Sequence, residues 1–394
     1  MSFQLSQLGF LLFISALVAM LTRRLRMPYT VGLVVAGMIL YLFHVHLTLH
    51  LSRELIFFVF LPPLVFEAAL FISWRELKTE LPLVALLATV GVILAAAVTA
   101  IGMRYALNWD WGSAVVFGVL IAATDPVSVI ATFKEAGVRG RLRLLIEAES
   151  LLNDGTAAVA FVAVLGLLAG THQGVAAITG MILLTMVGGA LTGAAIAAGF
   201  MLLAGRTPDY LVELTFTTLA AYGSFFAAEY LHLSGVLAAL TAGLVVGNFR
   251  SSALITNTGR QALEPFWEYA AFIANSLIFL LIGAQVAQQH FGGLWFPVIA
   301  AITVVTLGRA VAIYPICAMF LRSRLEVKSQ YQHMLFWGGL RGALALALAL
   351  AVPPEIPQHD AIITLTFAVV AFSIFAQGLT ISPLLRSLGE IDPK

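Results

Sequence analysis

Apolar runs of about 16 to 27 residues recur along the chain of 394 residues, and short segments between them carry most of the charged side chains. Each run is long enough to cross a hydrocarbon layer about 30 Å thick as a helix. The runs lack the alternation of apolar and polar positions that marks barrel strands, so they predict an all-α membrane protein. About 13 spans are predicted, at residues 6–22, 30–45, 54–72, 82–106, 112–133, 142–169, 176–205, 210–231, 234–249, 263–288, 294–321, 331–353 and 360–388.

The distribution of lysine and arginine predicts how these spans are oriented. With the N-terminus outside, the cytoplasmic loops hold 17 of the 21 basic residues, whereas only Arg53 and Arg104 fall on the other side. This is the bias that cytoplasmic loops show, and an odd number of spans then places the C-terminus in the cytoplasm. Basic residues follow the first apolar run and do not precede it, so we interpret this run as a retained helix and not as a signal peptide.

Composition narrows the class of protein further. The chain is 61% hydrophobic and 10% charged, which leaves too little polar surface for a water-soluble protein of this size. Its net charge of +1 argues against a nucleic-acid partner, and its single cysteine, Cys317, excludes an intrachain disulfide or a thiolate metal site. We therefore expect one integral domain over 1–394, in contact with the lipids of the cell's inner membrane.

A weak internal repeat is present. A shift of 217 residues places Val59–Glu67 over Ser276–Ala284, and Thr124-Asp125-Pro126 over Arg341-Gly342-Ala343. The paired segments are an odd number of spans apart, so the two copies would have opposite orientations, as in many transporters. This predicts a first repeat at about 6–169, a connecting helix at about 176–205 and an inverted second repeat at about 210–388. Chance likeness between apolar stretches is the alternative.

Four acidic residues lie deep within predicted spans: Glu67, Asp125, Glu149 and Asp154. A charge at the centre of a spanning helix costs roughly 2.5–3.5 kcal/mol, so these positions indicate function. Pro126 directly follows Asp125 and disfavours helix there, which predicts a helix broken inside the membrane. Such a break frees carbonyl groups and presents two half-helix ends that together can hold a cation. A tolerated proline kink is the alternative.

The sixth span carries a polar stripe. Ser150 and Asp154 are four residues apart, as are Glu149 and Asn153, so all four side chains share one helix face. That face cannot point to lipid. A structural hydrogen-bond network explains Ser150 and Asn153, but it accounts poorly for an aspartate with no basic residue beside it in the sequence.

The other charged groups within the spans need partners too. Arg341, in the twelfth span, predicts a carboxylate partner, for which Glu149 is the candidate; we interpret this pair as structural. Arg309 is a second buried cation for which the sequence indicates no partner.

Acids elsewhere in the spans are open to more than one interpretation. Glu67 follows the pair Pro62-Pro63, and it belongs either to the cation pathway or, as a protonated glutamate, to the core. Glu213 and Glu229 lie near the ends of their span, where their side chains are expected to reach the interface.

Five segments in order along the chain resemble one known family: AATDPVSV, ESLLNDGTA, LHLSGVLA, FIANSLIFLLIG and WGGLRGALALALAL. The chain resembles the NhaP-type sodium/proton antiporters of the first cation:proton antiporter group, to which the eukaryotic sodium/proton exchangers also belong. The resemblance implies a homodimer and an elevator-like alternating access. It implies that Asp154 is the main carboxylate that binds cation or proton, with further ligands from Asp125, the backbone of Thr124, the Ser150 hydroxyl and Glu67. It also implies that Asn153 replaces a second aspartate of electrogenic relatives, and that Glu149 and Arg341 form a stabilising ion pair.

Together these features predict cation/proton exchange. Burial penalises the carboxylate form of Asp154, so a proton competes with a cation for its oxygens. Oxygen ligands suit sodium, lithium or potassium, with Na⁺ as the first expectation, and no cofactor is implied. One exchanging carboxylate predicts electroneutral, one-for-one exchange. The alternative is a channel or uniporter without proton coupling; an intramembrane aspartyl hydrolase is disfavoured because no water-activating partner accompanies Asp125 and Asp154.

Overall fold

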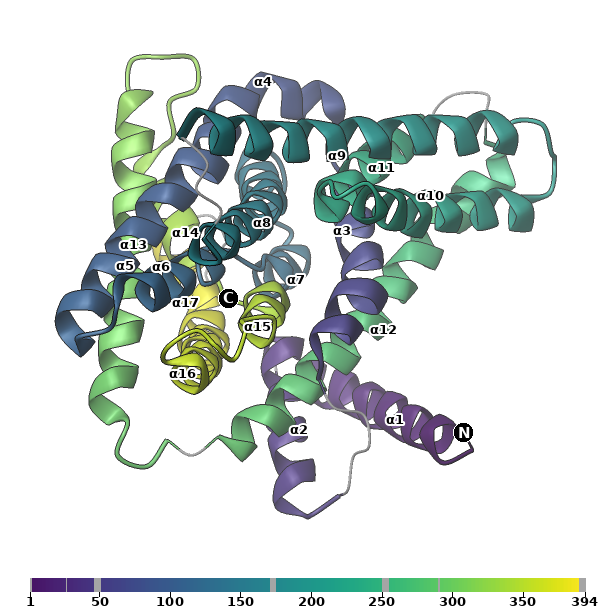
Figure 1. Ribbon diagram of the computed structural model, residues 1–394. Coiled ribbons are helices and arrows are strands. Elements are labelled where there is room, and N and C mark those ends of the chain that lie inside the picture. The colour runs from purple at the N-terminus through teal and green to yellow at the C-terminus, as the bar shows by residue number, and fades with distance from the viewer. Residues whose placement is uncertain are drawn as a thin grey trace. The chain divides into compact units, whose positions relative to one another are not determined.

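The computed structural model describes residues 2–25, 27–45, 51–170, 175–249, 255–289 and 291–389, and its regular elements are all helices (Figure 1). Arg26, Arg250 and Lys394, which contribute to the predicted charge bias, lie outside the described residues. In chain order the helices are α1 (Ser2–Leu25), α2 (Tyr29–Leu42), the π-helix η1 (Leu55–Phe60), α3 (Leu61–Leu70), α4 (Trp74–Leu86), the π-helix η2 (Leu87–Gly91), α5 (Val92–Leu107), α6 (Trp111–Leu120), α7 (Val127–Ala136), α8 (Arg141–Leu168), α9 (Val175–Ala204), α10 (Tyr210–Tyr230), α11 (Gly235–Phe249), α12 (Asn257–Gln288), α13 (Trp295–Met319), α14 (Ser329–Trp337), α15 (Ala343–Leu350), α16 (His359–Phe372), the π-helix η3 (Ser373–Gln377) and α17 (Gly378–Ser387).

Eight of the helices within the described ranges are long and apolar enough to cross a membrane, and shorter apolar helices accompany them. They fall on the apolar runs of the sequence: the run predicted at 142–169, for example, is α8, and the run at 82–106 makes up most of the continuous helix Trp74–Leu107. The all-helical membrane fold is therefore confirmed. The number of crossings, the inverted repeat and the sides of the two termini stay predictions.

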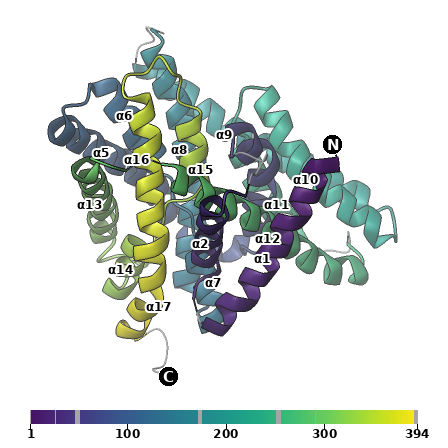
Figure 2. The same cartoon turned by 90° about the horizontal axis from the view of Figure 1, so that it is seen from below.

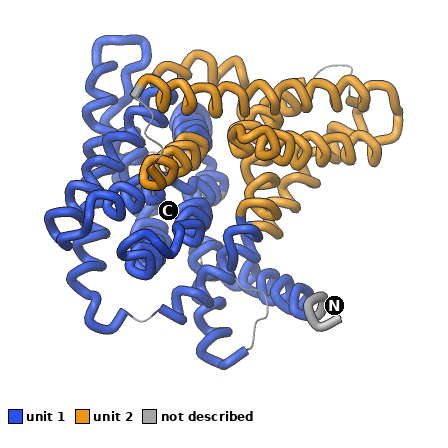
Figure 3. The backbone as a smooth tube through the Cα atoms, viewed as in Figure 1, with its two compact units in different colours: residues 1–56, 83–153, 275–394 blue, residues 57–82, 154–274 orange. Residues whose placement is uncertain are grey.

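The chain forms two compact units (Figure 3). Unit 1 comprises residues 1–56, 83–153 and 275–394, and unit 2 comprises residues 57–82 and 154–274. Helices α4, α8 and α12 contribute residues to both units. These units do not follow the predicted division into 6–169, 176–205 and 210–388, which described sequence repeats and not compact bodies.

In unit 1, α13 packs along α5, and α5 packs along α6 (Figure 1). Helices α16 and α17 follow one another through η3 as one long rod (Figure 2). Close approach depends on small residues, as in many membrane proteins. A side chain at Gly37 of α2 would overlap the Leu280 carbonyl of α12, and one at Gly283 of α12 would overlap the Val34 carbonyl of α2. Glycine at both positions thus lets α2 and α12 pack backbone against backbone.

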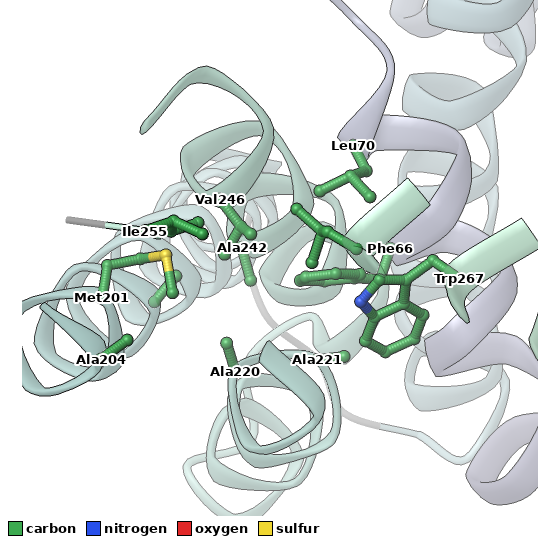
Figure 4. Close-up of a cluster of buried hydrophobic side chains, with 12 residues drawn as sticks. Phe66, Leu70, Met201, Ala204, Ala220, Ala221, Ala242, Val246, Ile255 and Trp267 are labelled. Carbon is green, nitrogen blue, oxygen red and sulfur yellow. The ribbon is translucent and has the colours of Figure 1, made fainter. Parts of the chain in front are cut away.

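Unit 2 has a core of its own, built from α3, α9, α10, α11 and α12. Phe66 of α3 and Trp267 of α12 lie against each other with ring centroids 4.4 Å apart (Figure 4). The Trp267 indole donates a hydrogen bond of 3.1 Å to the Thr217 hydroxyl of α10, which satisfies the one polar group of this large buried ring.

Two glutamates of unit 2 hold helix N-termini. Glu213 is 2% exposed, and its carboxylate accepts hydrogen bonds from the backbone and hydroxyl of Thr256, both 2.9 Å long, immediately before α12. Glu229 accepts from the backbone amide of Gly235, the first residue of α11, at 3.0 Å. A carboxylate at a helix N-terminus satisfies free N–H groups and the helix dipole. The expectation that Glu213 reaches the interface is therefore wrong, because the loop before α12 returns to it.

Candidate functional site

The helix predicted to break at Pro126 does break. α6 ends at Leu120 and α7 begins at Val127, so residues 121–126 between them are not helical. A second break separates α14 from α15 at residues 338–342. The two unwound segments touch, since the backbone amide of Asp125 donates to the Leu340 carbonyl at 2.8 Å. We call residues 121–126 and 338–342 together the crossover.

The Asp125 carboxylate joins two half-helices at the crossover. It accepts a hydrogen bond from the backbone amide of Val127 at 2.9 Å, and its other oxygen lies against Gly342. Val127 is the first residue of α7 and Gly342 directly precedes α15, so one carboxylate lies at the positive ends of both helices. Gly342 makes this approach possible, because a side chain there would overlap that of Asp125.

Arg341 serves the opposite end of a half-helix. Its guanidinium donates to the Ala122 and Ala123 carbonyls, at 2.8 and 3.1 Å, just beyond the C-terminus of α6. Ser373 of η3 holds the same residue by its backbone: the Ser373 hydroxyl accepts from the Arg341 amide and lies 3.1 Å from the Arg341 carbonyl. Nothing in the sequence indicates this role of Ser373, because only the fold brings η3 to the crossover.

A hydrogen-bond network joins the crossover to α8. The Thr124 amide donates to the Asn153 side-chain oxygen at 3.2 Å, and the Asn153 side-chain nitrogen donates to the Thr124 hydroxyl at 2.6 Å. The Ser150 hydroxyl donates to the Thr124 carbonyl. All three residues are at most 3% exposed. The predicted residues Thr124, Asp125, Ser150 and Asn153 are thus brought together in unit 1.

Glu149 forms its ion pair with Arg309 of α13, not with Arg341 as the sequence analysis expected. Both guanidinium Nη atoms donate to the carboxylate, at 2.7 and 2.8 Å, and the Asn153 amide adds a third hydrogen bond at 3.0 Å. Arg309 also donates to the Leu335 carbonyl in the last turn of α14. The expectation was wrong because the Arg341 guanidinium instead binds the carbonyls that the break after α6 leaves free. Sequence spacing cannot show which of two buried arginines packs beside α8.

The other two predicted ligands belong to unit 2. Asp154 directly follows Asn153, and it lies one turn beyond Ser150 on the uninterrupted helix α8. Glu67 lies in α3, next to the buried Phe66. Both carboxylate-bearing residues are partly buried. Glu67 as a ligand of the same cation as Asp125 stays a prediction.

The potential ligands at this site are oxygen atoms. The Thr124 carbonyl and the Ser150 hydroxyl lie in contact beside the first unwound segment, one turn before Asp154. Oxygen donors of this kind suit a hard monovalent cation, and charges at the half-helix ends are neutralised by Asp125, Arg341 and Arg309.

Comparison with known proteins identifies a family of membrane transporters. Residues 10–387 match the profile of the family described as "Sodium/hydrogen exchanger, transmembrane". The Na⁺/H⁺ antiporter ApNhaP of Aphanothece halophytica is 38% identical over 372 residues, which cover 93% of this chain and 70% of the relative. The Na⁺/H⁺ antiporter NhaH of Halobacillus dabanensis is 33% identical over 398 residues, which cover 98% of each chain.

A solved structure has the same fold. The sodium proton antiporter MjNhaP1 of Methanocaldococcus jannaschii superposes with a TM-score of 0.76 at 19% sequence identity, covering 99% of this chain and 97% of the other. At this sequence identity the superposition shows a shared fold and nothing about function.

Proposed function

Since the chain belongs to the transmembrane sodium/hydrogen exchanger family, we propose that it exchanges a monovalent cation, sodium foremost, for protons across the membrane. The observation that carries the proposal furthest is the crossover in unit 1. There the Ser150 hydroxyl of α8 contacts the Thr124 carbonyl, which directly precedes Asp125 in the chain, and Asp154 follows one turn later on α8. We assign the cation to these oxygen ligands, with Glu67 of α3 as a further contributor.

Competition at Asp154 supplies the coupling. Its carboxylate binds either the cation or a proton, and the site changes sides only when one of them neutralises the charge. The Ser150 hydroxyl donates to the Thr124 carbonyl. A cation that takes both oxygens as ligands requires that hydroxyl to rotate. Occupancy and the local hydrogen-bond pattern are therefore linked.

Asn153 supports one-for-one exchange. Its amide nitrogen donates to the Thr124 hydroxyl and to Glu149, and its oxygen accepts from the Thr124 amide. This neutral side chain is held by partners on both sides and binds no proton in the physiological range. With Asp154 as the one exchanging carboxylate, the transport is electroneutral.

Alternating access by an elevator-like movement and assembly as a homodimer complete the proposal. The surface of α9 supports an environment of lipid or of a second subunit, because Leu183, Leu184, Val187 and Leu191 are each more than half exposed. All four lie on one helix that spans Val175–Ala204.

The test is exchange by the purified protein in liposomes that contain a pH-sensitive dye. A sodium gradient is expected to drive proton movement, and equal potassium on both sides with valinomycin is expected to leave the rate unchanged. Sodium, lithium and potassium gradients across a pH series rank the transported ions. Sodium flux without proton movement would identify a channel or uniporter instead, and a rate that changes when valinomycin clamps the membrane potential would exclude one-for-one exchange.

A further inference from the structure

A small cavity lies in unit 1 on the side of the crossover formed by α13, α14, α16 and η3. It has room for about one water-sized ligand. Apolar side chains such as Phe336 and Phe372 form part of its wall, and the rest of the wall is polar. None of the residues that were assigned to the cation lines it.

The polar part of the wall carries positive charge. Arg309 and Arg341 both line the cavity, and none of the other lining residues that the structure describes is acidic. Glu149 binds Arg309 from outside this wall, at 2.7 and 2.8 Å. Two arginines against this one carboxylate leave a net positive charge around the cavity, which disfavours a cation and distinguishes the cavity from the oxygen-lined cation site.

Gln377 of η3 makes the cavity a candidate binding site. It is 7% exposed and lines the cavity, yet its side-chain amide forms no hydrogen bond with any residue that the structure describes. An amide that faces a cavity without a hydrogen-bond partner in the protein favours a ligand or water beside it. The two hydroxyls of the wall are already used, because Thr306 donates to the Ile302 carbonyl and Ser373 donates to the Val370 carbonyl.

We propose that this cavity binds one small anion of the size of chloride, held by the Arg309 and Arg341 guanidinium groups and the Gln377 amide. Each of these groups offers N–H donors, and two of them carry positive charge, which favours an anion over neutral water. Chloride is somewhat larger than water, so its binding requires a small outward shift of the wall, and larger anions such as carboxylates with a chain are disfavoured further. A bound anion would tie α13, the crossover and η3 together, so it stabilises unit 1 without taking part in the exchange.

The test is thermal unfolding of the purified protein followed by tryptophan fluorescence, at fixed sodium concentration, pH and ionic strength, as chloride replaces gluconate. Chloride is expected to raise the melting temperature saturably, because it binds the folded state alone. Gln377→Leu is expected to raise the half-saturating chloride concentration about tenfold, the effect of losing one hydrogen bond to a charged ligand. Gln377→Glu places a carboxylate in the cavity and is expected to abolish the response.

Gln332→Leu is the matched control. Its amide donates to the Val327 carbonyl away from the cavity, so this change is expected to alter baseline stability and leave the chloride response intact. Bromide soaked into crystals is expected to give anomalous density beside Gln377. Equal melting temperatures in chloride and gluconate, or the same chloride response in Gln377→Leu as in the parent, would overturn the proposal and leave the proposed transport function untouched.

Discussion

Asp125, Arg309 and Arg341 each bind the end of a half-helix in unit 1. Asp125 accepts from the N-terminus of α7 and lies against that of α15, whereas the two arginines donate to carbonyls at the ends of α6 and α14. The free N–H and C=O groups of broken helices are costly inside a membrane, where water does not satisfy them. By satisfying these groups, the three side chains lower the free-energy cost of the breaks. The same breaks expose the oxygens that are proposed to hold the cation.

The sequence predicted part of this arrangement at the level of single residues. Pro126 after Asp125 indicated the break, and the spacing of Ser150 and Asn153 indicated one polar face toward it. The partner of Glu149 was predicted wrongly, because nothing local in the sequence distinguishes Arg309 from Arg341. Pairing across helices depends on how they pack.

The buried ion pair leads to a prediction for stability. Glu149→Gln or Arg309→Gln is expected to destabilise the protein by about 3–5 kcal/mol, because each leaves the other charge buried without its partner. The measurement is the melting temperature of the protein in detergent, which is expected to fall in each single variant. The double variant is expected to lose less than the sum of the two.

Glu147→Gln, two residues earlier in α8, is the control for this prediction. Its partner Arg143 is 24% exposed, so water screens that pair and a smaller loss is expected. Unchanged melting temperatures of Glu149→Gln and Arg309→Gln together with abolished exchange would place the pair in the transport mechanism and contradict a stabilising role.

At the scale of elements, the crossover rests on two breaks of different origin. Proline marks the first one in the sequence, whereas the second lies within Trp337-Gly-Gly-Leu-Arg341-Gly-Ala343, where glycines permit a break but do not require it. The shift of 217 residues that places Asp125 over Gly342 connects the two breaks. Contact between them, from the Asp125 amide to the Leu340 carbonyl, is a property of the folded chain.

Gly342→Ala tests the contact between these elements. The added methyl group would overlap the Asp125 side chain, so Asp125 is expected to leave the N-terminus of α15. Exchange in liposomes is expected to fall at least tenfold while circular dichroism still reports a helical protein. Gly180→Ala is the matched control, since a methyl group there meets no other atom within 4 Å, and its exchange is expected to equal that of the parent. Full activity of Gly342→Ala would show that the close approach is dispensable.

At the scale of the whole molecule, the sequence predicted the class of fold because membrane helices must satisfy their own backbone and bury apolar side chains in lipid. Apolar runs such as 142–169 and 294–321 reappear as α8 and α13 with ends that differ by a few residues. Division into compact units was not predictable in the same way, because α8 and α12 each contribute to both units and carry no break in sequence where the units change.

The central claim is that Asp154 carries cation and proton in turn. Sodium-driven proton movement in liposomes, measured for Asp154→Asn beside the parent protein, tests it most directly. Asp209→Asn is the control, since Asp209 caps the start of α10 through the Leu211 amide and asparagine caps equally well. We predict that Asp154→Asn abolishes exchange with expression and melting temperature retained, while Asp209→Asn exchanges at the rate of the parent. Normal sodium-dependent proton movement by Asp154→Asn would contradict it.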